Sequence, residues 1–454
     1  MTQELAQTLT EIFNDSDHQL YLVGGSVRDQ LLGLESTDLD FAASARPDET
    51  RRLLELAGPS TIFDIGEKFG TIGAVFDDVK VEITTFRSEW YLDEDRRPEV
   101  EFSNSLEADL SRRDFTINAM AENALQGRLI DPHGGLRDLS ARKVRAVGVA
   151  AERFREDPLR MLRAVRFAAQ LGFSIERSTR EAIKAHVDRM RLVSGERVRN
   201  EMQGILLSRS PSYGIREMVE LGFAKIFIPE LLELRRTTQG RRAKDVFEHT
   251  LRVLQNSPPN LLVRWAALLH DIGKPQTIVE RNGEIHFPSH ERVGESLSRS
   301  ILRRLRLDTN SIDRVSNLVG MHMRANQYQD DWNDGAVRRL IRDASDDLPR
   351  LLELSEADVT SYRPARVQAA LRRVERLRRR CEAVQAAEDA IQLQSPLDGH
   401  DLMRMFDRPP GPWIRLVKDH LLERVLDGDL GSDDIETATQ MAKEFVAAKL
   451  AEQT

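Results

Sequence analysis

The sequence contains a single cysteine, Cys381, among 454 residues. One cysteine excludes an internal disulfide framework and any zinc cluster built from cysteines, and it agrees with a reducing compartment. A metal site in this chain must therefore use histidine and carboxylate ligands.

Long apolar runs and internal repeats are absent as well. The longest apolar stretch, LLVRWAALL at Leu261–Leu269, is interrupted by Arg264 and is too short to span a bilayer. The N-terminal segment MTQELAQTLTEIF lacks the basic-then-apolar pattern of a secretory signal. We therefore expect a cytoplasmic protein without a membrane partner, and the lack of a fixed-period repeat argues against a solenoid.

The formal net charge of -8 argues only weakly against a nucleic-acid partner, because the positive charges are unevenly distributed. Local basic surfaces can coexist with a negative total. Arginines cluster at residues 112–113, at 160, 163 and 166, and across residues 372–380.

The distribution of β-rich and helical patterns predicts an α+β protein. Short β-rich runs such as YLVGG, DLDFAA, TIGAVF and KVEITTF occur between residues 20 and 140, which predicts a small α/β head with a mixed sheet. From about Arg153 onward the patterns are helical, with Gly172 as a stop signal and the polar segment RRTTQGRRAKD (residues 235–245) as a linker. We expect a head at residues 1–140 and three helical parts at 141–240, 241–365 and 366–454.

The segment LVGGSVRDQLLGLESTDLDF (residues 22–41) combines a glycine turn with two carboxylates. Gly24 and Gly25 permit a tight turn after a strand, and the amides of the following helix, with Arg28, suit a phosphate. Because side chains alternate along a strand, Asp38 and Asp40 share one face, where a divalent cation would relieve their repulsion. Oxygen ligands favour Mg²⁺, and Glu82 in KVEITTF could supply a third carboxylate.

Five ordered motifs between residues 22 and 202 resemble the class II tRNA nucleotidyltransferases, also called CCA-adding enzymes, and the related bacterial poly(A) polymerases. The first motif is LVGGSVRDQLLG with DLDF. The others are RRDFTINAM (112–120), DPHGGLRDL (131–139), REDPLRMLRAVRFAAQLGF (155–173) and GERVRNEM (195–202). The resemblance implies a nucleotidyltransferase head, a helical neck and body that recognise the base and tRNA, and a hinge at Gly134-Gly135.

The second motif carries groups suited to a nucleotide. Arg113 can neutralise triphosphate oxygens, and Asp114 can accept a hydrogen bond from a ribose hydroxyl, although it could also cap a following helix. We include Asn118 among the nucleotide-binding residues.

In the fourth motif Asp157, Arg160, Arg163 and Arg166 recur at intervals of three, which predicts one stripe along a helix. The resemblance implies that Asp157 and Arg160 pair with the edge of the incoming base. Arg163 and Arg166 would then lie near the triphosphate or hold that pair in position.

The implied reaction uses two Mg²⁺ ions on Asp38 and Asp40, so that the 3′-hydroxyl of tRNA attacks the α-phosphate of CTP or ATP. Two segments favour the addition of the complete CCA: DEDRRPEVEF (residues 93–102), in a loop that the family associates with adding the terminal A, and GEKFGTI (residues 66–72). Alternatives are an A-adding or CC-adding enzyme, a poly(A) polymerase, or a phosphohydrolase whose head only binds RNA.

A second group of polar residues lies in the helical half. It comprises His249, His270, Asp271, His290, His322 and Asp358. Because FEHTLRVLQN and LLVRWAALLHD predict an antiparallel helix pair, His249 and His270 should meet at one end of it.

The pattern resembles the HD superfamily of metal-dependent phosphohydrolases. The resemblance implies His249, His270, Asp271 and Asp358 as ligands of a divalent transition metal or Mg²⁺, with His290 and His322 at a second metal or at phosphate. Such a site would hydrolyse phosphate esters, for example at a damaged tRNA end. Ser289 departs from the glycine that is frequent at this position.

After Asp358, RVQAALRRVERLRRRCEAVQAAEDAIQ predicts a long helix with one apolar stripe. The arginines on its other faces are expected either to contact tRNA phosphates or to form a solvated face.

Overall fold

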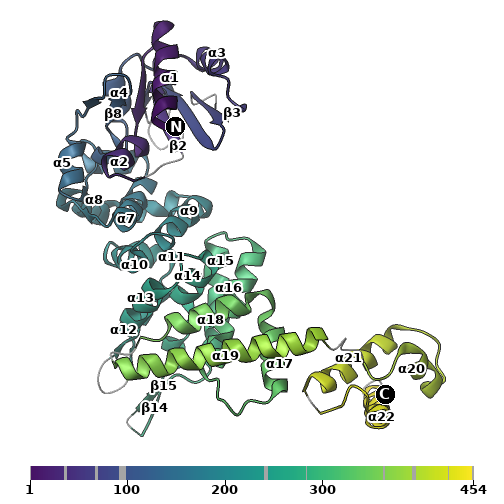
Figure 1. Ribbon diagram of the computed structural model, residues 1–454. Helices are drawn as coiled ribbons and strands as arrows, with labels where there is room; N and C mark the ends of the chain where they lie inside the picture. Colours follow the sequence, from purple (N-terminus) through teal and green to yellow (C-terminus); the bar gives the residue numbers. More distant parts are fainter. Residues whose placement is uncertain are drawn as a thin grey trace. The chain divides into compact units, whose positions relative to one another are not determined.

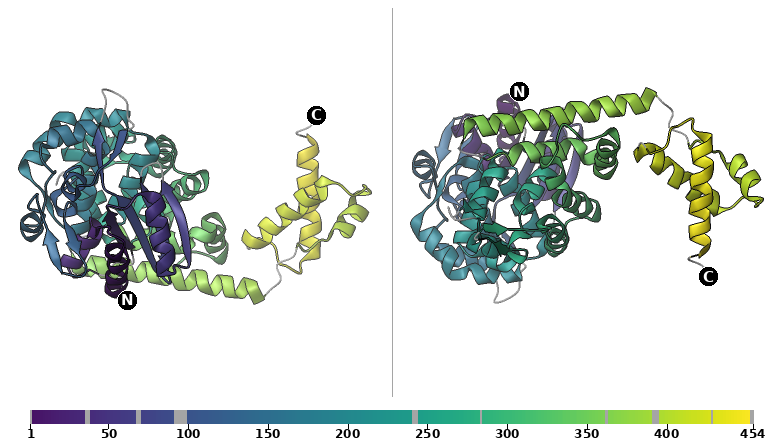
Figure 2. Two further views of the ribbon diagram at one scale, coloured as in Figure 1. Left: turned by 90° about the horizontal axis from the view of Figure 1, so that it is seen from above. Right: turned by 90° about the horizontal axis from the view of Figure 1, so that it is seen from below.

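The computed structural model describes residues 2–34, 38–66, 70–90, 99–239, 244–282, 284–360, 363–390, 395–427 and 429–451. The chain divides into two compact units, one of residues 1–232 with 304–306, the other of residues 233–303 with 307–454. Figure 1 shows the elements of each unit, and Figure 2 gives two further views. Among the described residues, no helix is long and apolar enough to cross a membrane.

The first unit begins with a seven-stranded mixed sheet in the order β3-β4-β5-β2-β1-β8-β9. Strands β2 and β5 pair in parallel, and the other neighbours pair antiparallel. The bounds are β1 Leu20–Val23, β2 Asp38–Ala43, β3 Thr61–Gly66, β4 Thr71–Phe76, β5 Val79–Thr85, β8 Ala121–Asn123 and β9 Arg128–Ile130. The sheet together with the helical remainder confirms the predicted α+β class.

Short helices and a hairpin complete the head. Helix α1 packs on β1 and on α3, and α2 connects the glycine turn to β2. The bounds are α1 Thr2–Asp15, α2 Gly25–Leu31, α3 Pro47–Ala57, β6 Arg87–Trp90, β7 Glu99–Phe102, α4 Leu106–Ser111, the 3-10 turn η2 Thr116–Asn118 and α5 Gly135–Ser140.

The rest of the first unit is helical, apart from the short parallel pair β10 and β11. Its central helix, α7, ends as predicted at Gly172, whose φ of 68° is left-handed. The bounds are β10 Lys143–Val144, α6 Ala150–Glu156, α7 Leu159–Leu171, β11 Ser174–Ile175, α8 Arg177–His186, the 3-10 turn η3 Val187–Leu192, α9 Gly195–Leu206, α10 Pro211–Glu220 and α11 Phe223–Phe227.

The predicted four-residue stripe on one helix is wrong for Asp157. Asp157 ends α6 with an extended backbone (φ -135°, ψ 102°), and α7 begins after Pro158. The physical reason is Pro158, because a proline disfavours helical backbone at the residue before it and has no N–H to donate. Only Arg160, Arg163 and Arg166 lie on α7.

In the second unit a helical bundle surrounds the histidines. The bounds are α13 Val246–Asn256, α14 Leu261–Leu269, the 3-10 turns η4 Lys274–Gln276 and η5 Ser345–Asp347, β14 Val279–Arg281, β15 Glu284–His286, α15 His290–Arg304, α16 Thr309–Asn326, α17 Asp334–Ala344 and α18 Leu348–Ala357. Helix α12, Glu230–Arg236, crosses the boundary between the units.

The predicted linker at residues 235–245 contains two short strands, β12 Thr238–Gln239 and β13 Lys244–Asp245, which pair antiparallel. Residues 240–243 lie outside the described residues. The three domain boundaries at 140, 240 and 365 stay a prediction.

The C-terminal part consists of a long helix and a small helical cluster. On α19, Pro364–Ala390, the predicted apolar stripe is buried at Val374, Leu377, Cys381 and Val384 and packs on α18. Helices α20 Gly399–Phe406, α21 Pro412–Asp427 and α22 Ile435–Ala451 form a separate apolar core around Leu402 and Leu421.

Candidate active sites

The glycine turn and β2 are held together by Ser26. Its Oγ accepts a hydrogen bond from the N–H of Asp40 (2.9 Å) and donates one to the carbonyl of Asp38 (3.2 Å). Gly24 has φ 67° and ψ -128°, a backbone conformation that suits glycine. The turn therefore fixes the start of α2 directly beside the two aspartates.

The strand pairing places a third carboxylate beside Asp40. Asp38 lies opposite Lys80 on β5, and Asp40 lies opposite Glu82. Burial and the charge of Glu82 raise the pKa of Asp40, against the opposing effect of Arg113. A carboxyl whose pKa is raised by a neighbouring carboxylate suits a divalent cation, which would offset the repulsion.

The carboxylate oxygens of Asp38, Asp40 and Glu82 do not lie as close to one another as the ligands of a three-residue metal site. Among the described residues, groups of three ligand atoms within 4.8 Å of one another occur only around the histidines of the second unit. An oxygen of Glu82 lies 2.6 Å from the Lys80 ammonium. Glu82 would have to exchange Lys80 for a cation to act as the third ligand.

Arg113 approaches the glycine turn closely. Its guanidinium donates to the buried carboxylate of Asp109 (3.0 Å), which also binds Arg112. A Cβ on Gly24 would lie 2.8 Å from Nη1 of Arg113. Asp109 thus aims Arg113 at the turn, where the sequence predicts a triphosphate.

A chain of hydrogen bonds joins three of the sequence motifs. Arg28 donates to Oδ1 of Asn118 (2.6 Å), and Nδ2 of Asn118 donates to Oδ1 of Asp114 (3.1 Å). Arg163 on α7 donates to Oδ2 of Asp114 (2.8 Å). Asp114 also accepts a hydrogen bond from the N–H of Phe115. The cap alternative is wrong, because the N-cap of η2 is Phe115 and η2 has no side-chain cap hydrogen bond. The ribose contact of Asp114 stays a prediction.

Asp157 and Arg160, which the resemblance pairs with a base, have separate protein partners. Asp157 binds Arg197 (2.8 Å). Arg160 is buried and binds Glu156 (3.0 Å) and the carbonyl of Arg112 (3.0 Å). The structure brings them to neighbouring positions at the kink, and their role in base recognition stays a prediction.

Glu201, on α9, is a further site residue that is not among those predicted from the sequence. Its carboxylate lies 2.8 Å from Arg166 and 3.8 Å from Arg163. The guanidinium carbons of Arg28, Arg163 and Arg166 all lie within 5.3 Å of the centre of the Phe167 ring. The fifth motif, GERVRNEM, is the sequence feature that could have indicated Glu201, because it supplies both Arg197 and Glu201 four residues apart.

The six predicted polar residues of the second unit do come together. Nε2 of His249 and Nε2 of His270 are 3.3 Å apart, as the antiparallel helix pair predicts. Two groups have their ligand atoms within 4.8 Å of one another. One comprises His249, His270 and Asp358, and the other Asp271, His290 and His322.

The histidine rings are oriented for metal binding. Nδ1 of His270, His290 and His322 each lies within 2.9 Å of a backbone carbonyl, and Nδ1 of His249 lies 2.8 Å from Oγ1 of Thr360. A carbonyl holds the proton on Nδ1, which leaves the Nε2 lone pair for a metal.

Three observations fit a metal at this site. Nε2 of His290 is buried and has no hydrogen-bond partner. Burial lowers the pKa of His322 to about 4, so its ring is neutral at pH 7 and can act as a ligand. Burial alone would raise the pKa of Asp271, but His270 and Lys274 outweigh it and hold that carboxyl ionised, with its pKa well below the usual range.

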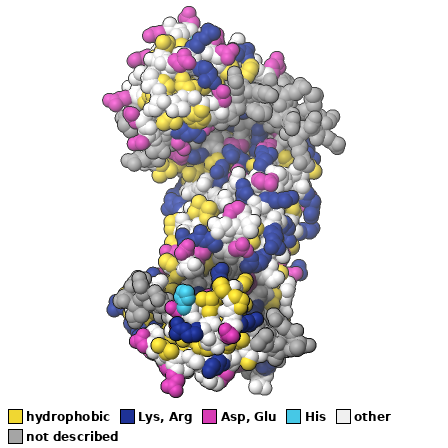
Figure 3. Space-filling model, turned by 90° about the vertical axis from the view of Figure 1, so that its right-hand side faces the viewer, with side chains coloured by type: hydrophobic (Ala, Val, Ile, Leu, Met, Phe, Trp, Pro, Cys, Tyr) yellow, Lys and Arg dark blue, Asp and Glu magenta, His cyan; other side chains and the backbone are white. Residues whose placement is uncertain are grey.

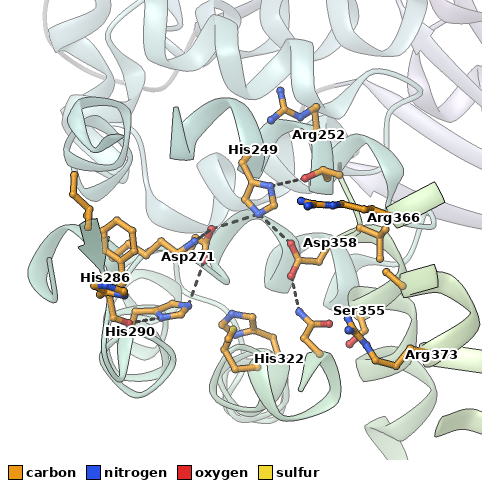
Figure 4. A pocket seen from close by; sticks show the side chains of 18 residues that line it. His249, Arg252, Asp271, His286, His290, His322, Ser355, Asp358, Arg366 and Arg373 are labelled. Atoms are coloured by element: carbon orange, nitrogen blue, oxygen red, sulfur yellow. Dashed lines mark hydrogen bonds and ion pairs between the residues drawn. The ribbon is translucent and has the colours of Figure 1, made fainter. Parts of the chain in front are cut away.

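These groups open into a cavity of about 590 Å³ (Figure 4). Lys274 donates to Asp271 (2.7 Å), and Asn326 donates to Asp358 (2.6 Å), so both carboxylates are fixed by neighbours. The remaining lining is mixed, with apolar side chains and further cations. It includes Arg252, Ile285, Phe287, Met323, Arg366, Ala370 and Arg373.

Most arginines of α19 are paired with carboxylates and do not form an unpaired basic face. Figure 3 shows Lys and Arg side chains interspersed with Asp and Glu on the face that it presents. On α19 four arginines bind carboxylates, in the pairs Arg376–Asp330, Arg378–Glu356, Arg379–Glu375 and Arg380–Asp334. This pairing reduces the positive charge available for tRNA phosphates.

Family models match three parts of the chain. They are the poly A polymerase head domain at residues 20–145, a probable RNA- and SrmB-binding site of polymerase A at 172–234, and an HD domain at 246–363. Together they span both of the sites described above.

Similar proteins cover nearly the whole chain. An A-adding tRNA nucleotidyltransferase of Deinococcus radiodurans is 34% identical over 90% of this chain and 92% of its own length. A CCA-adding enzyme of Geobacillus thermodenitrificans is 31% identical over 92% of each chain. The solved structure of the Bacillus stearothermophilus CCA-adding enzyme in complex with CTP has a TM-score of 0.68 at 26% identity, covering 99% of this chain and 98% of that one. The chain therefore belongs to the class II tRNA nucleotidyltransferases, the family of the CCA-adding enzymes, and carries an HD domain.

Proposed function

We propose that the protein adds C, C and A to the 3′ end of tRNA from CTP and ATP without a nucleic-acid template. The observation that carries this proposal is the head site, where Asp38 and Asp40 lie on one strand beside the turn at Gly24 and beside Arg113. The near full-length similarity to CCA-adding enzymes supports the same substrates.

The residues of the head have distinct roles in this proposal. Asp38 and Asp40 would hold Mg²⁺, which when bound would supply Lewis-acid stabilisation of the attack by the tRNA 3′-hydroxyl on the α-phosphate, with pyrophosphate as the leaving group. Arg113 binds triphosphate oxygens at the glycine turn. Arg28 and Asn118 hold Asp114 in place for a ribose hydroxyl.

The incoming base is recognised at the break between α6 and α7. There a base contacts Asp157 and Arg160, and it competes with their present partners Arg197 and Glu156. Arg163 and Arg166 support this pair through Asp114 and Glu201. Side chains thereby take the place of a template strand.

An A-adding activity is the second candidate, because one near full-length relative bears that name. Both segments that favour complete CCA addition lie partly outside the described residues. Residues 93–98 of the segment 93–102 and residues 67–69 of the segment 66–72 are not described. The transcript assay given in the Discussion distinguishes three further alternatives. They are CC-only addition, poly(A) synthesis, and a head that binds RNA without transferring nucleotides.

We further propose that the HD domain hydrolyses phosphate groups at RNA 3′ ends. A divalent transition metal or Mg²⁺ bound by His249, His270, Asp271 and Asp358 would activate water there. His290 and His322 would complete a second metal position together with Asp271, or bind phosphate. Lys274 fixes Asp271 for this role.

The head proposal is tested with Asp40→Ala, using Asp78→Ala, an exposed turn position of the same sheet, as the matched control. We expect Asp40→Ala to abolish nucleotide incorporation while tRNA binding, measured by filter retention, stays within about twofold of the original protein because few phosphate contacts change. Incorporation by Asp40→Ala at the level of the control would contradict the metal assignment.

A further inference from the structure

Two arginines reach the HD cavity from outside the part of the chain that matches the HD family. That match ends at residue 363, and α19 begins at Pro364. Arg366, Ala370 and Arg373 nevertheless line the same cavity as the metal-ligand groups (Figure 4). Positions i, i+4 and i+7 lie on one helix face, so α19 presents two cations with the small side chain of Ala370 between them.

These two arginines differ from the arginines that follow them on the helix. Arg376, Arg378, Arg379 and Arg380 all bind carboxylates. Within the described residues, the guanidinium groups of Arg366 and Arg373 have no ion-pair partner. Arg366 is exposed at the rim, whereas Arg373 is half-buried and its Nε is buried without a hydrogen bond. A buried guanidinium nitrogen that lacks a partner and lines a cavity is a site for an anionic ligand.

The cavity has room and surface for more than one phosphate. Its volume of about 590 Å³ falls within the range of pockets for ligands of nucleotide size. With a metal bound, the two metal-ligand groups would accommodate one phosphate, and the apolar side chains of Ile285, Phe287 and Met323, which line the same cavity, would contact a ribose and base. Arg366 and Arg373 of α19 would then be available to bind a second anionic group of the same ligand.

We propose that the HD cavity binds a nucleotide that carries two phosphate groups, one at the metal-ligand groups and the other held by Arg366 and Arg373. This inference rests on the proposed phosphohydrolase function. The terminal nucleotide of an RNA with a 3′-phosphate has this chemistry, because it carries both the terminal phosphate and a 5′-phosphodiester. Hydrolysis adds water across the terminal P–O bond and yields a ribose hydroxyl and inorganic phosphate, while the arginines select the substrate.

The test compares uridine 3′-monophosphate with uridine 3′,5′-bisphosphate, since uracil is not a base that the head is proposed to add. Binding to the full chain is measured by calorimetry with Mg²⁺, Mn²⁺ or Ni²⁺ supplied in turn. Arg366→Gln and Arg373→Gln are the test variants. The matched control is Arg372→Gln, an exposed arginine of the same helix that is not among the residues lining the cavity.

We expect the original protein to bind the bisphosphate at least about tenfold more tightly, the factor typical of one charge-assisted hydrogen bond. Each test variant should lose this preference and keep its affinity for the monophosphate, which also shows that it is folded. Equal binding of the two nucleotides by the original protein, or an equal loss in Arg372→Gln, would overturn the inference.

Release of inorganic phosphate, measured on the same samples, separates this inference from the hydrolase proposal. An arginine-dependent preference without phosphate release under any of the three metals contradicts hydrolysis and supports the two-phosphate site. Release from both nucleotides with the same KM supports hydrolysis and refutes the role of the arginines.

Discussion

Replacing Gly24 by alanine should disturb the position of Arg113 and with it the binding of both nucleotides. The added Cβ would lie 2.8 Å from Nη1 of Arg113, closer than side chains approach without displacement. The backbone at φ 67° and ψ -128° adds strain of about 1–3 kcal/mol for a residue other than glycine.

The effect on catalysis can be estimated from the contact that Arg113 makes with a triphosphate. A hydrogen bond to a charged group contributes about 1.5–3 kcal/mol, so its loss should raise the KM for nucleotides roughly 10- to 150-fold. Because Arg113 is proposed to contact phosphate and not the base, the increase should be similar for CTP and ATP.

The assay measures the KM for CTP on tRNA ending before CCA and for ATP on tRNA ending in CC. Gly58→Ala is a suitable control, because Gly58 also has positive φ (68°) but no atom within 4 Å of the added Cβ. It should lose about 1 kcal/mol of stability and keep its KM. The double variant Gly24→Ala with Arg113→Ala should be no worse than Arg113→Ala alone.

An unchanged KM in Gly24→Ala, or effects of the two substitutions that simply add, would refute this reasoning. A rise in KM for only one of the two nucleotides would place Arg113 at the base and not at the phosphates.

Two further predictions concern stability and the HD site. Burial raises the pKa of Glu176, but hydrogen bonds from Ser178 and Thr179 and the charge of Arg145 outweigh it and lower the pKa to about 2. The ionised Glu176 carboxylate therefore stabilises the fold fully above 4.5, the pKa of the unfolded chain, and this stabilisation is lost as the pH falls toward 2. Glu176→Ala should lower the free energy of unfolding by about 0.5–2 kcal/mol at pH 7 and by less at pH 3, as measured by urea unfolding. An equal cost at both pH values would contradict this. Asp271→Ala should abolish phosphate release and reduce bound metal, measured by elemental analysis, while CTP incorporation continues; loss of incorporation as well would show that the two sites are not independent.

Much of the local structure could be predicted from the sequence, because it depends on neighbouring residues. The glycine turn, the shared face of Asp38 and Asp40, and the end of α7 at Gly172 all follow from backbone preferences. The break at Asp157 also follows from Pro158, but the regular three-residue spacing of the charged residues points instead to one continuous helix.

Long-range partners were not predictable in the same way. Arg376 and Arg380 bind acidic residues 46 positions earlier in the chain, and no local pattern indicates such pairs. The contact between Arg197 and Asp157, across 40 positions, is of the same kind. The cations of α19 that line the HD cavity required the fold, because the sequence shows only that they belong to an arginine-rich helix.

The central claim is tested most directly by incubating the purified protein and Mg²⁺ with tRNA transcripts that end before CCA, after CC and after the complete CCA. CTP, ATP or both are supplied, and product lengths are resolved on a sequencing gel. The account predicts three additions to the first transcript, one A on the second and none on the third. Addition of A alone, of two C residues alone, or of a long A tail would contradict complete CCA addition, and the absence of any product would contradict the assignment of the head as the transferase.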